Sequence, residues 1–329
     1  MKSKSLKISL YFGVSFCILF LFYFYPKIQY AKYNPTKDTL KSIQNHVKNL
    51  SQKIGERNLR KPKALQDTAT YIKSFLSKLN LKVKTQKYEV LTNKDYLPVA
   101  QRKLPFFVEN IYITLNANSK LNTLVIGAHY DTFIGTQGAD DNASSVALLL
   151  EIIKKVSQTK LKRPIIFVFF TLEEPPFFQS QEMGSYQFAK MLKNNNTEIL
   201  GMISLDCVGY FSEKQSYPFP LNLVYSGKGD FLALISSFQS SFFYKKIITN
   251  IKKSYQLEIK TFLLPSFLPG VSYSDHWSFE QFNYRGVLFS DSAFYRSNHY
   301  HEDTDTFQTL NYQKLSEFKE ILQNLVLIL

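Results

Sequence analysis

The sequence is poor in cysteine, with only Cys17 and Cys207 in 329 residues. Two cysteines cannot build the framework of several disulfides that stabilises small secreted domains, and Cys17 lies in an apolar segment. The chain also has no internal repeat and no low-complexity tract. These absences exclude a disulfide scaffold and argue against a repeat protein, and the cysteine count says little about the redox compartment.

Acidic residues are scarce, at 26 against 40 lysines and arginines, for a net charge of +14. The imbalance is local, because residues 1–63 contain thirteen basic residues against Asp38 and Glu56, and the rest of the chain carries only +3. A basic N-terminal segment is typical of membrane flanks and solvated helices, so nucleic-acid binding is not predicted. With 45% hydrophobic and 16% aromatic residues, a packed core is expected and disorder is excluded.

One long apolar run, Ile8 to Tyr25, contains no charge over eighteen residues. It is either a membrane anchor or a signal peptide, and its bulky residues and the lack of a small-x-small cleavage site favour an anchor. The predicted organisation is a cytoplasmic N-terminus at 1–7, the membrane segment at 8–25, a linker at 26–38 and a catalytic domain at 39–329. The lysines before the run place this domain outside the cytoplasmic membrane, or secreted if the segment is cleaved.

Beyond the linker, short apolar runs alternate with stretches of helical periodicity, which favours an α/β domain with a mostly parallel sheet covered by helices on both faces. Amphipathic helices are expected between residues 40 and 79 and over the last seventeen or so residues. Predicted strands are 81–91, 110–115, 123–128, 164–170, 201–205 and 286–289, and the helices between them are 143–156 and 184–192.

Each central strand is followed by residues suited to metal binding: His129 after the first, Glu173 and Glu174 after the second, and Asp206 after the third. Because ligands of open α/β sheets bind outside the carboxyl ends of the strands, we expect these side chains to converge. The stretch from His129 to Asp141 adds further carboxylates. A metal site is therefore predicted at this edge of the sheet.

Six elements occur in one order along the chain: H129-Y-D131, G-A-D140-D141-N-A-S, E173-E174, Asp206, S274-D275-H276-W-S-F279 and Y300-H301-E-D-T-D305-T306. From about residue 39 to the end, the chain thereby resembles the co-catalytic zinc aminopeptidases, a family related to glutamate carboxypeptidase and glutaminyl cyclase. The resemblance implies the zinc exopeptidase fold, a three-layer α/β/α sandwich around a mixed sheet. It also implies a hydrolase that removes N-terminal residues from peptides.

Position by position, the resemblance implies two zinc ions. One is held by His129 and Asp206, the other by Glu174 and His301, and Asp140 bridges the two. The resemblance also implies that the peptide bond between Asp140 and Asp141 is cis. Imidazole and carboxylate are ordinary zinc ligands, and three per ion leave room for water. The resemblance further implies that Asp131 orients the imidazole of His129. It also implies that Glu173 is the general base that takes a proton from water.

Four further residues are candidates for substrate contact because they lie close in sequence to the ligands. Phe177 and Phe178 belong to a segment that follows the glutamate pair, and they would wall the pocket for the first side chain. Tyr295 and Arg296 precede His301 and would contact the substrate or an intermediate.

Two other functions remain open from the sequence. A glutaminyl cyclase shares the H-Y-D and E-E elements but binds one zinc ion, and the paired aspartates fit the two-metal enzymes better. A membrane-anchored scaffold that has lost catalysis would lack several of the ligands, which are all present here. The substrate, the residue preference, the oligomeric state and the native metal are not determined by the sequence.

Overall fold

The computed structural model describes residues 34–329, apart from 104, 220, 224, 226 and 252–255. The predicted cytoplasmic N-terminus and membrane segment, and the linker up to residue 33, lie outside the described residues. None of the helices in the described part of the chain is both long enough and apolar enough to cross a membrane.

The domain is built on one mixed eight-stranded sheet with the order β1-β2-β4-β3-β5-β8-β6-β7. The four central strands β4, β3, β5 and β8 are parallel to one another, while β1, β2 and the β6–β7 pair join through antiparallel contacts. The strands are β1 (Lys84–Glu89), β2 (Phe107–Leu115), β3 (Thr123–His129), β4 (Ile165–Phe170), β5 (Ile199–Leu205), β6 (Phe231–Ser237), β7 (Glu258–Leu264) and β8 (Gly286–Ser290).

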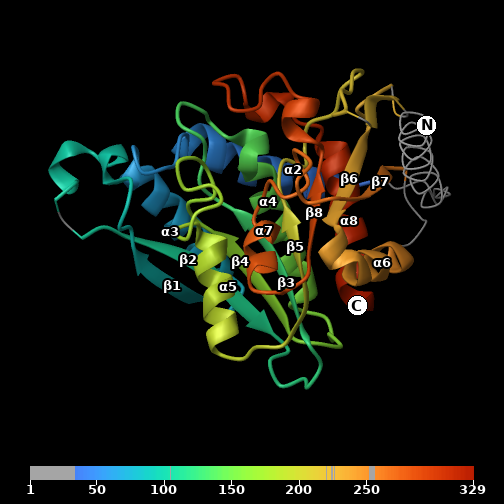
Figure 1. Cartoon of the computed structure of the whole chain (residues 1–329), viewed down its shortest axis with the longest axis horizontal. Coiled ribbons are helices and arrows are strands. Elements are labelled where there is room, and N and C mark those ends of the chain that lie inside the picture. Colours follow the sequence, from blue (N-terminus) through green and yellow to red (C-terminus); the bar gives the residue numbers. More distant parts are fainter. Residues whose placement is uncertain (1–33, 104, 220, 224, 226, 252–255) are drawn as a thin grey trace, which may run out of the picture.

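Helices cover both faces of this sheet, as predicted (Figure 1). On β4, Phe167 and Phe169 belong to the largest hydrophobic core, whereas Val168 and Phe170 belong to a second, smaller one; a third cluster lies on β6 and β7. A strand that is buried on both faces needs apolar residues at every position, which explains its uninterrupted apolar sequence. The larger core lies under α2 (Lys37–Lys48), α3 (Pro62–Lys78), α4 (Ser145–Val156), α6 (Ser241–Asn250) and α8 (Tyr312–Ile328), and the smaller one under α5 (Gly184–Asn194) and α7 (His276–Gln281).

Strands β6 and β7 and helix α6 are absent from the sequence-based assignment. β6 begins with an apolar run, Phe231–Ile235, of the kind that marks the central strands, so a signal was present. β7 alternates buried and partly exposed residues and includes Glu258 and Lys260, as expected of an edge strand. This pair extends the sheet beyond β8.

The parallel strands β3, β4 and β5 end side by side, which brings their following residues together. His129 pairs in register with Phe170, the last residue of β4. Asp206 follows β5, and its amide donates to the carbonyl of Phe289 in β8. The predicted convergence of side chains at the carboxyl edge of the sheet is therefore confirmed.

Candidate metal centre

His129 is fully buried at the end of β3 and presents Nε2 to the interior of the site. Its other ring nitrogen, Nδ1, lies 3.2 Å from the main-chain oxygen of Asp131 and 3.5 Å from the Asp131 carboxylate. Contacts on Nδ1 hold the ring so that Nε2 remains free for a ligand. The Asp131 carboxylate thus lies beside the imidazole, as its predicted orienting role requires, and the role itself stays a prediction.

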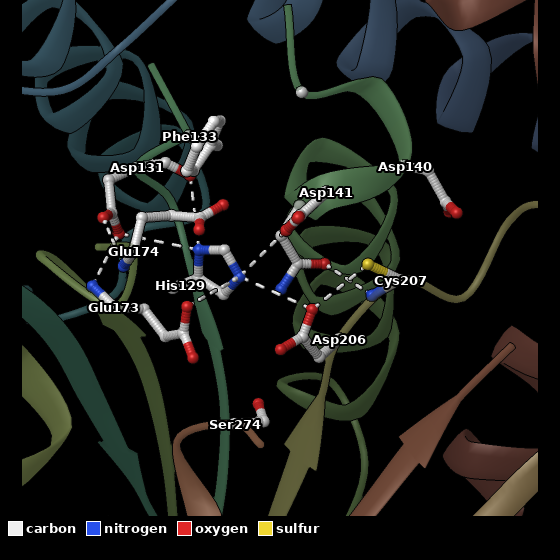
Figure 2. Close-up of polar contacts among 12 residues, drawn as sticks. His129, Asp131, Phe133, Asp140, Asp141, Glu173, Glu174, Asp206, Cys207 and Ser274 are labelled. Atoms are coloured by element: carbon white, nitrogen blue, oxygen red, sulfur yellow. Dashed lines mark hydrogen bonds and ion pairs between the residues drawn. The ribbon is translucent and has the colours of Figure 1, made fainter. Parts of the chain in front are cut away.

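The carboxylate of Asp131 also holds the backbone of the glutamate pair (Figure 2). Its Oδ1 accepts the amide of Glu173 at 3.2 Å, and its Oδ2 accepts the amide of Glu174 at 3.1 Å. Asp131 therefore links the end of β3 to the turn that follows β4.

The structure places Asp141, not Asp140, between the two histidines. Asp141 Oδ1 lies 3.3 Å from His129 Nε2, and Oδ2 lies 3.3 Å from His301 Nε2. Asp140 points away from this cluster, and its Oδ1 accepts the amide of Gly209 at 2.8 Å (Figure 2). The predicted bridging position is thus corrected by one residue.

The cis peptide bond is displaced in the same way, because it joins Asp141 to Asn142 and not Asp140 to Asp141. Both Asp141 and Asn142 leave the helical conformation within the turn η4 (Ala139–Ser144) that precedes α4. The Asn142 side chain donates to the carbonyl of Leu205, at the end of β5, at 2.9 Å. This turn directs consecutive side chains to different sides, and Asp141 is the one that faces the strand ends.

Asp305, for which the sequence suggested no role, holds the aspartate pair from the other side. Its carboxylate oxygens accept the amides of Asp140 at 2.9 Å and Asp141 at 3.1 Å. The signal was its place in the late H-x-x-x-D-T element, four residues after His301. Asp305 and Asp131 thus act alike, each accepting two consecutive amides.

The second half of the cluster is formed by Glu174 and His301, with 3.1 Å between Glu174 Oε2 and His301 Nε2. The imidazole of His301 is stacked between the rings of Phe133, at 4.0 Å between centroids, and Tyr300, at 3.8 Å. Its neighbour His299 contacts Thr304 instead. The choice of His301 over His299 agrees with this arrangement.

Two triads of possible ligands share Asp141. The first is His129, Asp141 and Asp206; the second is Asp141, Glu174 and His301. In each, the candidate atoms lie within 4.8 Å of one another. Asp206 Oδ1 is 3.5 Å from His129 Nε2, and Glu173 Oε2 stands at 3.9 Å from the same nitrogen. Both histidine Nε2 atoms are buried without a hydrogen-bond partner.

The electrostatics of the site reflect carboxylates crowded in a buried space. Burial raises the pKa of the Glu173 carboxyl well above its usual range, and burial together with Asp141 raises the pKa of Glu174 to about 8. Burial opposes the charged form of His301, but Asp141 and Glu174 prevail and raise its pKa to about 10. Nitrogen and oxygen donors in which carboxyl groups outnumber imidazoles fit divalent zinc.

The four substrate candidates separate into two pairs. Phe178 lines the cleft over the ligands, and Tyr295 lines an adjoining apolar cavity. Phe177 is buried in the hydrophobic core, and Arg296 is buried with its guanidinium bonded to Gln215 Oε1 and to the main-chain oxygens of residues 210 and 231. Phe177 and Arg296 therefore line neither the cleft nor the apolar cavity, in contrast to the pocket roles predicted for them.

The cleft and the apolar cavity meet at four residues, Asp206, Tyr273, Phe294 and Tyr300. With their open mouths included, the cleft measures about 760 Å³ and the cavity about 780 Å³. Sequence reasoning missed Tyr273 and Phe294, because an aromatic residue in a loop carries no local sign of facing a ligand site. The deep walls of the cavity include Tyr217, Leu221, Phe231, Phe262, Leu264, Val271 and Leu288.

The chain is similar in sequence to several known proteins. The chain is 30% identical over 321 residues to the uncharacterized protein YfbL of Escherichia coli, covering 92% of this chain and 94% of that protein. It is 24% identical over 217 residues to leucine aminopeptidase 1 of Emericella nidulans, which is 60% of this chain and 50% of the fungal protein.

Two solved structures share the fold. BSAP, a zinc aminopeptidase from Bacillus subtilis, superposes with a TM-score of 0.68 at 16% identity, over 90% of this chain and 96% of the other. The glutaminyl cyclase of Bacteroides thetaiotaomicron gives 0.65 at 18% identity, over 89% and 99%. The predicted α/β fold is confirmed by these likenesses.

A family model matches most of the chain. Residues 110–326, which contain every ligand candidate described above, match the profile of peptidase family M28. The resemblance seen in the ordered sequence elements is confirmed by this match: the chain belongs to peptidase family M28.

Proposed function

We propose that this chain is a zinc-dependent aminopeptidase that removes N-terminal residues from peptides. Membership of peptidase family M28, a leucine aminopeptidase among the relatives and a zinc aminopeptidase among the similar folds support a zinc metallopeptidase. The observation that carries the two-metal form of the proposal is Asp141, whose two oxygens each face a different histidine.

The ligand sets follow from the two triads. One zinc ion would be held by His129, Asp141 and Asp206, and the other by Asp141, Glu174 and His301. When bound, the two ions would polarise the peptide carbonyl and acidify water. The Nε2 atoms of His129 and His301 and Oε1 of Glu174 are buried without a hydrogen-bond partner, which supports this assignment.

Glu173 has the position and the basicity of a proton carrier in this proposal. Its carboxylate enters the site, its amide is fixed by Asp131, and its burial makes the carboxyl readier to hold a proton. A buried glutamate with a raised pKa can accept a proton from water and return it to the leaving amine. Neither of the two proposed ligand triads includes Glu173, so its carboxylate is available for this role.

The apolar cavity supports a preference for N-terminal residues with large apolar side chains. It opens beside Asp206 and Tyr300, next to both ligand triads, and its deep walls are mostly aliphatic and aromatic. Burial of a leucine or phenylalanine side chain there contributes about 2 kcal/mol to substrate binding. Phe178, Tyr273 and Phe294 line the cleft above the ligands.

A screen of aminoacyl-arylamide substrates, combined with zinc analysis of the same purified sample, tests the proposal. Two zinc ions per chain and faster hydrolysis of leucyl and phenylalanyl than of glycyl or glutamyl substrates are expected. Hydrolysis that favours charged residues would contradict the role of the apolar cavity.

A glutaminyl cyclase is the second candidate, because cyclase structures share the fold over nearly the whole chain. This candidate requires one zinc ion and cyclisation of peptides that begin with glutamine. Measuring both reactions on one sample separates the candidates. A chain that binds zinc poorly and catalyses neither reaction would instead support a non-catalytic scaffold.

A further inference from the structure

A buried arginine far from the metal ligands in sequence holds the loop that brings two of them together. Arg57 lies between η1 (Asn49–Ile54) and α3, and its side chain is fully buried. Burial lowers its pKa to about 10, so the guanidinium stays charged at neutral pH. A buried charge is costly unless its hydrogen bonds are satisfied, which makes its partners informative.

The guanidinium of Arg57 donates to four main-chain carbonyls. Nε bonds Tyr130 O at 2.8 Å, and Nη1 bonds Gly55 O at 3.2 Å and Gln137 O at 2.7 Å. Nη2 bonds Gly138 O at 2.7 Å. Tyr130 directly follows the ligand His129, and Gly138 lies three residues before Asp141. One side chain therefore joins both ends of the loop between these two ligands.

The backbone near Arg57 reinforces this contact. The amide of Arg57 donates to Thr132 Oγ1 at 3.1 Å, and the amide of Thr132 donates to the carbonyl of Arg57 at 3.1 Å. Gly138 has a φ of +56°, and an added Cβ would lie 3.2 Å from Arg57 Nη2 and 2.3 Å from the carbonyl of Asp141. The loop therefore leaves no space for a side chain at position 138.

Arg57 and Asp305 bind opposite chemical groups of the same segment. Arg57 takes the carbonyls of Gln137 and Gly138, whereas Asp305 takes the amides of Asp140 and Asp141. Both sets of hydrogen bonds act on the segment that carries Asp141. The positive charge of Arg57 also acts on the carboxylates of the site, with Asp305, Asp131, Asp141 and Glu174 as its electrostatic partners.

We propose that Arg57 is the positioning residue for metal pairing, fixing the loop that sets Asp141 against His129 so that both zinc ions can be held at once. This inference rests on the proposed two-zinc function. It extends that function to a residue outside the matched range 110–326, contributed by a segment before α3. Arg57 touches neither substrate nor metal ligand side chains, and it acts through the backbone.

The test compares Arg57→Lys with Arg163→Lys. Arg163 is a matched control because it is also buried and donates to main-chain carbonyls, those of Leu329 at 2.6 Å and Asn122 at 2.8 Å, near the amino ends of β3 and β4. Both variants lose bonds to carbonyls while keeping a positive charge. Zinc content is measured after dialysis at a series of fixed free zinc concentrations, together with thermal unfolding.

We expect wild type and Arg163→Lys to hold two zinc ions alike, and Arg57→Lys to bind the second ion at least tenfold more weakly. Raising free zinc should restore kcat in Arg57→Lys but leave kcat of Arg163→Lys unchanged, because the control already holds both ions. Two ions held by Arg57→Lys within twofold of wild-type affinity would overturn the inference and leave the proposed function intact. Wild type with fewer than two ions would overturn both.

If Arg57→Lys does not fold, Gly138→Ala tests whether the loop held by Arg57 is required for binding of the second zinc ion. This variant keeps the arginine and disturbs the same loop. Weakened binding of the second ion supports the role of the loop in metal pairing, and unchanged binding of both ions overturns it.

Discussion

At the scale of single residues, two carboxylates of the site accept hydrogen bonds from backbone amides and fix the turns that carry other site residues. Asp131 accepts the amides of Glu173 and Glu174, and Asp305 accepts those of Asp140 and Asp141. Hydrogen bonds to a charged acceptor contribute about 1.5 to 3 kcal/mol each, so these contacts fix two turns firmly. The carboxylates that we propose as ligands thereby remain free to face a metal ion.

Replacing Glu173 by glutamine should separate catalysis from metal binding. Because the amide cannot carry a proton, we expect kcat to fall by about 10² to 10⁴-fold while zinc content stays at two per chain. The exposed Glu213, paired with Lys228, offers a control, and Glu213→Gln should leave kcat unchanged. Near-normal turnover of Glu173→Gln would rule out its role as the base.

The two neighbouring aspartates should respond differently to the same change. Asp141→Asn removes the shared carboxylate, so we expect it to retain at most one zinc ion per chain. Asp140→Asn should retain two, because Asp140 faces Gly209 and not the histidines. Elemental analysis of both dialysed variants measures this directly, and the opposite pattern would restore Asp140 as the bridging ligand.

At the scale of elements, the glutamate pair is placed by the packing of α5 against the end of β4. Gly184 begins α5, and its amide donates to the carbonyl of Thr171 at 2.8 Å. A Cβ at this position would lie 2.2 Å from that carbonyl and 2.4 Å from the Asn110 side chain. Only glycine lets the helix approach so closely to the turn that carries Glu173 and Glu174.

Gly184→Ala should therefore disturb both stability and catalysis. Overpacking of this kind costs about 1 to 3 kcal/mol, and the displaced turn should lower kcat because Glu173 moves with it. The exposed Lys190 in the same helix provides a control, since Lys190→Ala should change stability by less than about 0.5 kcal/mol. Urea unfolding and steady-state kinetics measure the two effects, and an unchanged Gly184→Ala variant would contradict the close contact.

At the scale of the whole molecule, three hydrophobic clusters support a sheet whose carboxyl edge gathers several buried carboxyl groups. A divalent cation bound among these carboxyl groups would stabilise the folded state relative to the unfolded one. We expect a chelator to lower the melting temperature and added zinc to restore it.

The size of that thermal effect is set by mass action. At a free zinc concentration a thousandfold above the dissociation constant, binding stabilises the folded state by about 4 kcal/mol per site. This corresponds to a rise of several degrees in the melting temperature for a domain of this size, measured by calorimetry with and without zinc. Magnesium at the same concentration serves as the control, and equal stabilisation by both ions would argue against a nitrogen-containing zinc site.

The N-terminal run is a separate question at this scale. We propose that residues 8–25 anchor the chain in a membrane with the peptidase domain outside the cytoplasm, on the strength of eighteen residues without a charge. Mass spectrometry of the chain purified from membranes should detect the intact N-terminus. A mature N-terminus near residue 32 would indicate a cleaved signal instead.

Much of the fold and site could be predicted from short-range patterns. The apolar runs of the central strands and the polar residues that follow them indicated the sheet and the edge where ligands gather. The edge strand β7 was not predicted, because Glu258 and Lys260 interrupt its apolar residues and its alternation breaks at Thr261 and Phe262, which are both buried. Phe177 and Phe178 are neighbours with the same side chain, and only packing decides that one enters the core and the other the cleft.

The sequence by itself determined the family, the chemical types of the ligands and their order along the chain, because these depend on residue identity and on strands that end at a common edge. The tertiary structure alone decided that Asp141 and not Asp140 faces the histidines, and that Arg57 is buried against the same loop. The physical reason is that a turn sends adjacent side chains in different directions. Its path is set by Arg57 and Asp305, which lie some 80 residues before it and 165 residues after it.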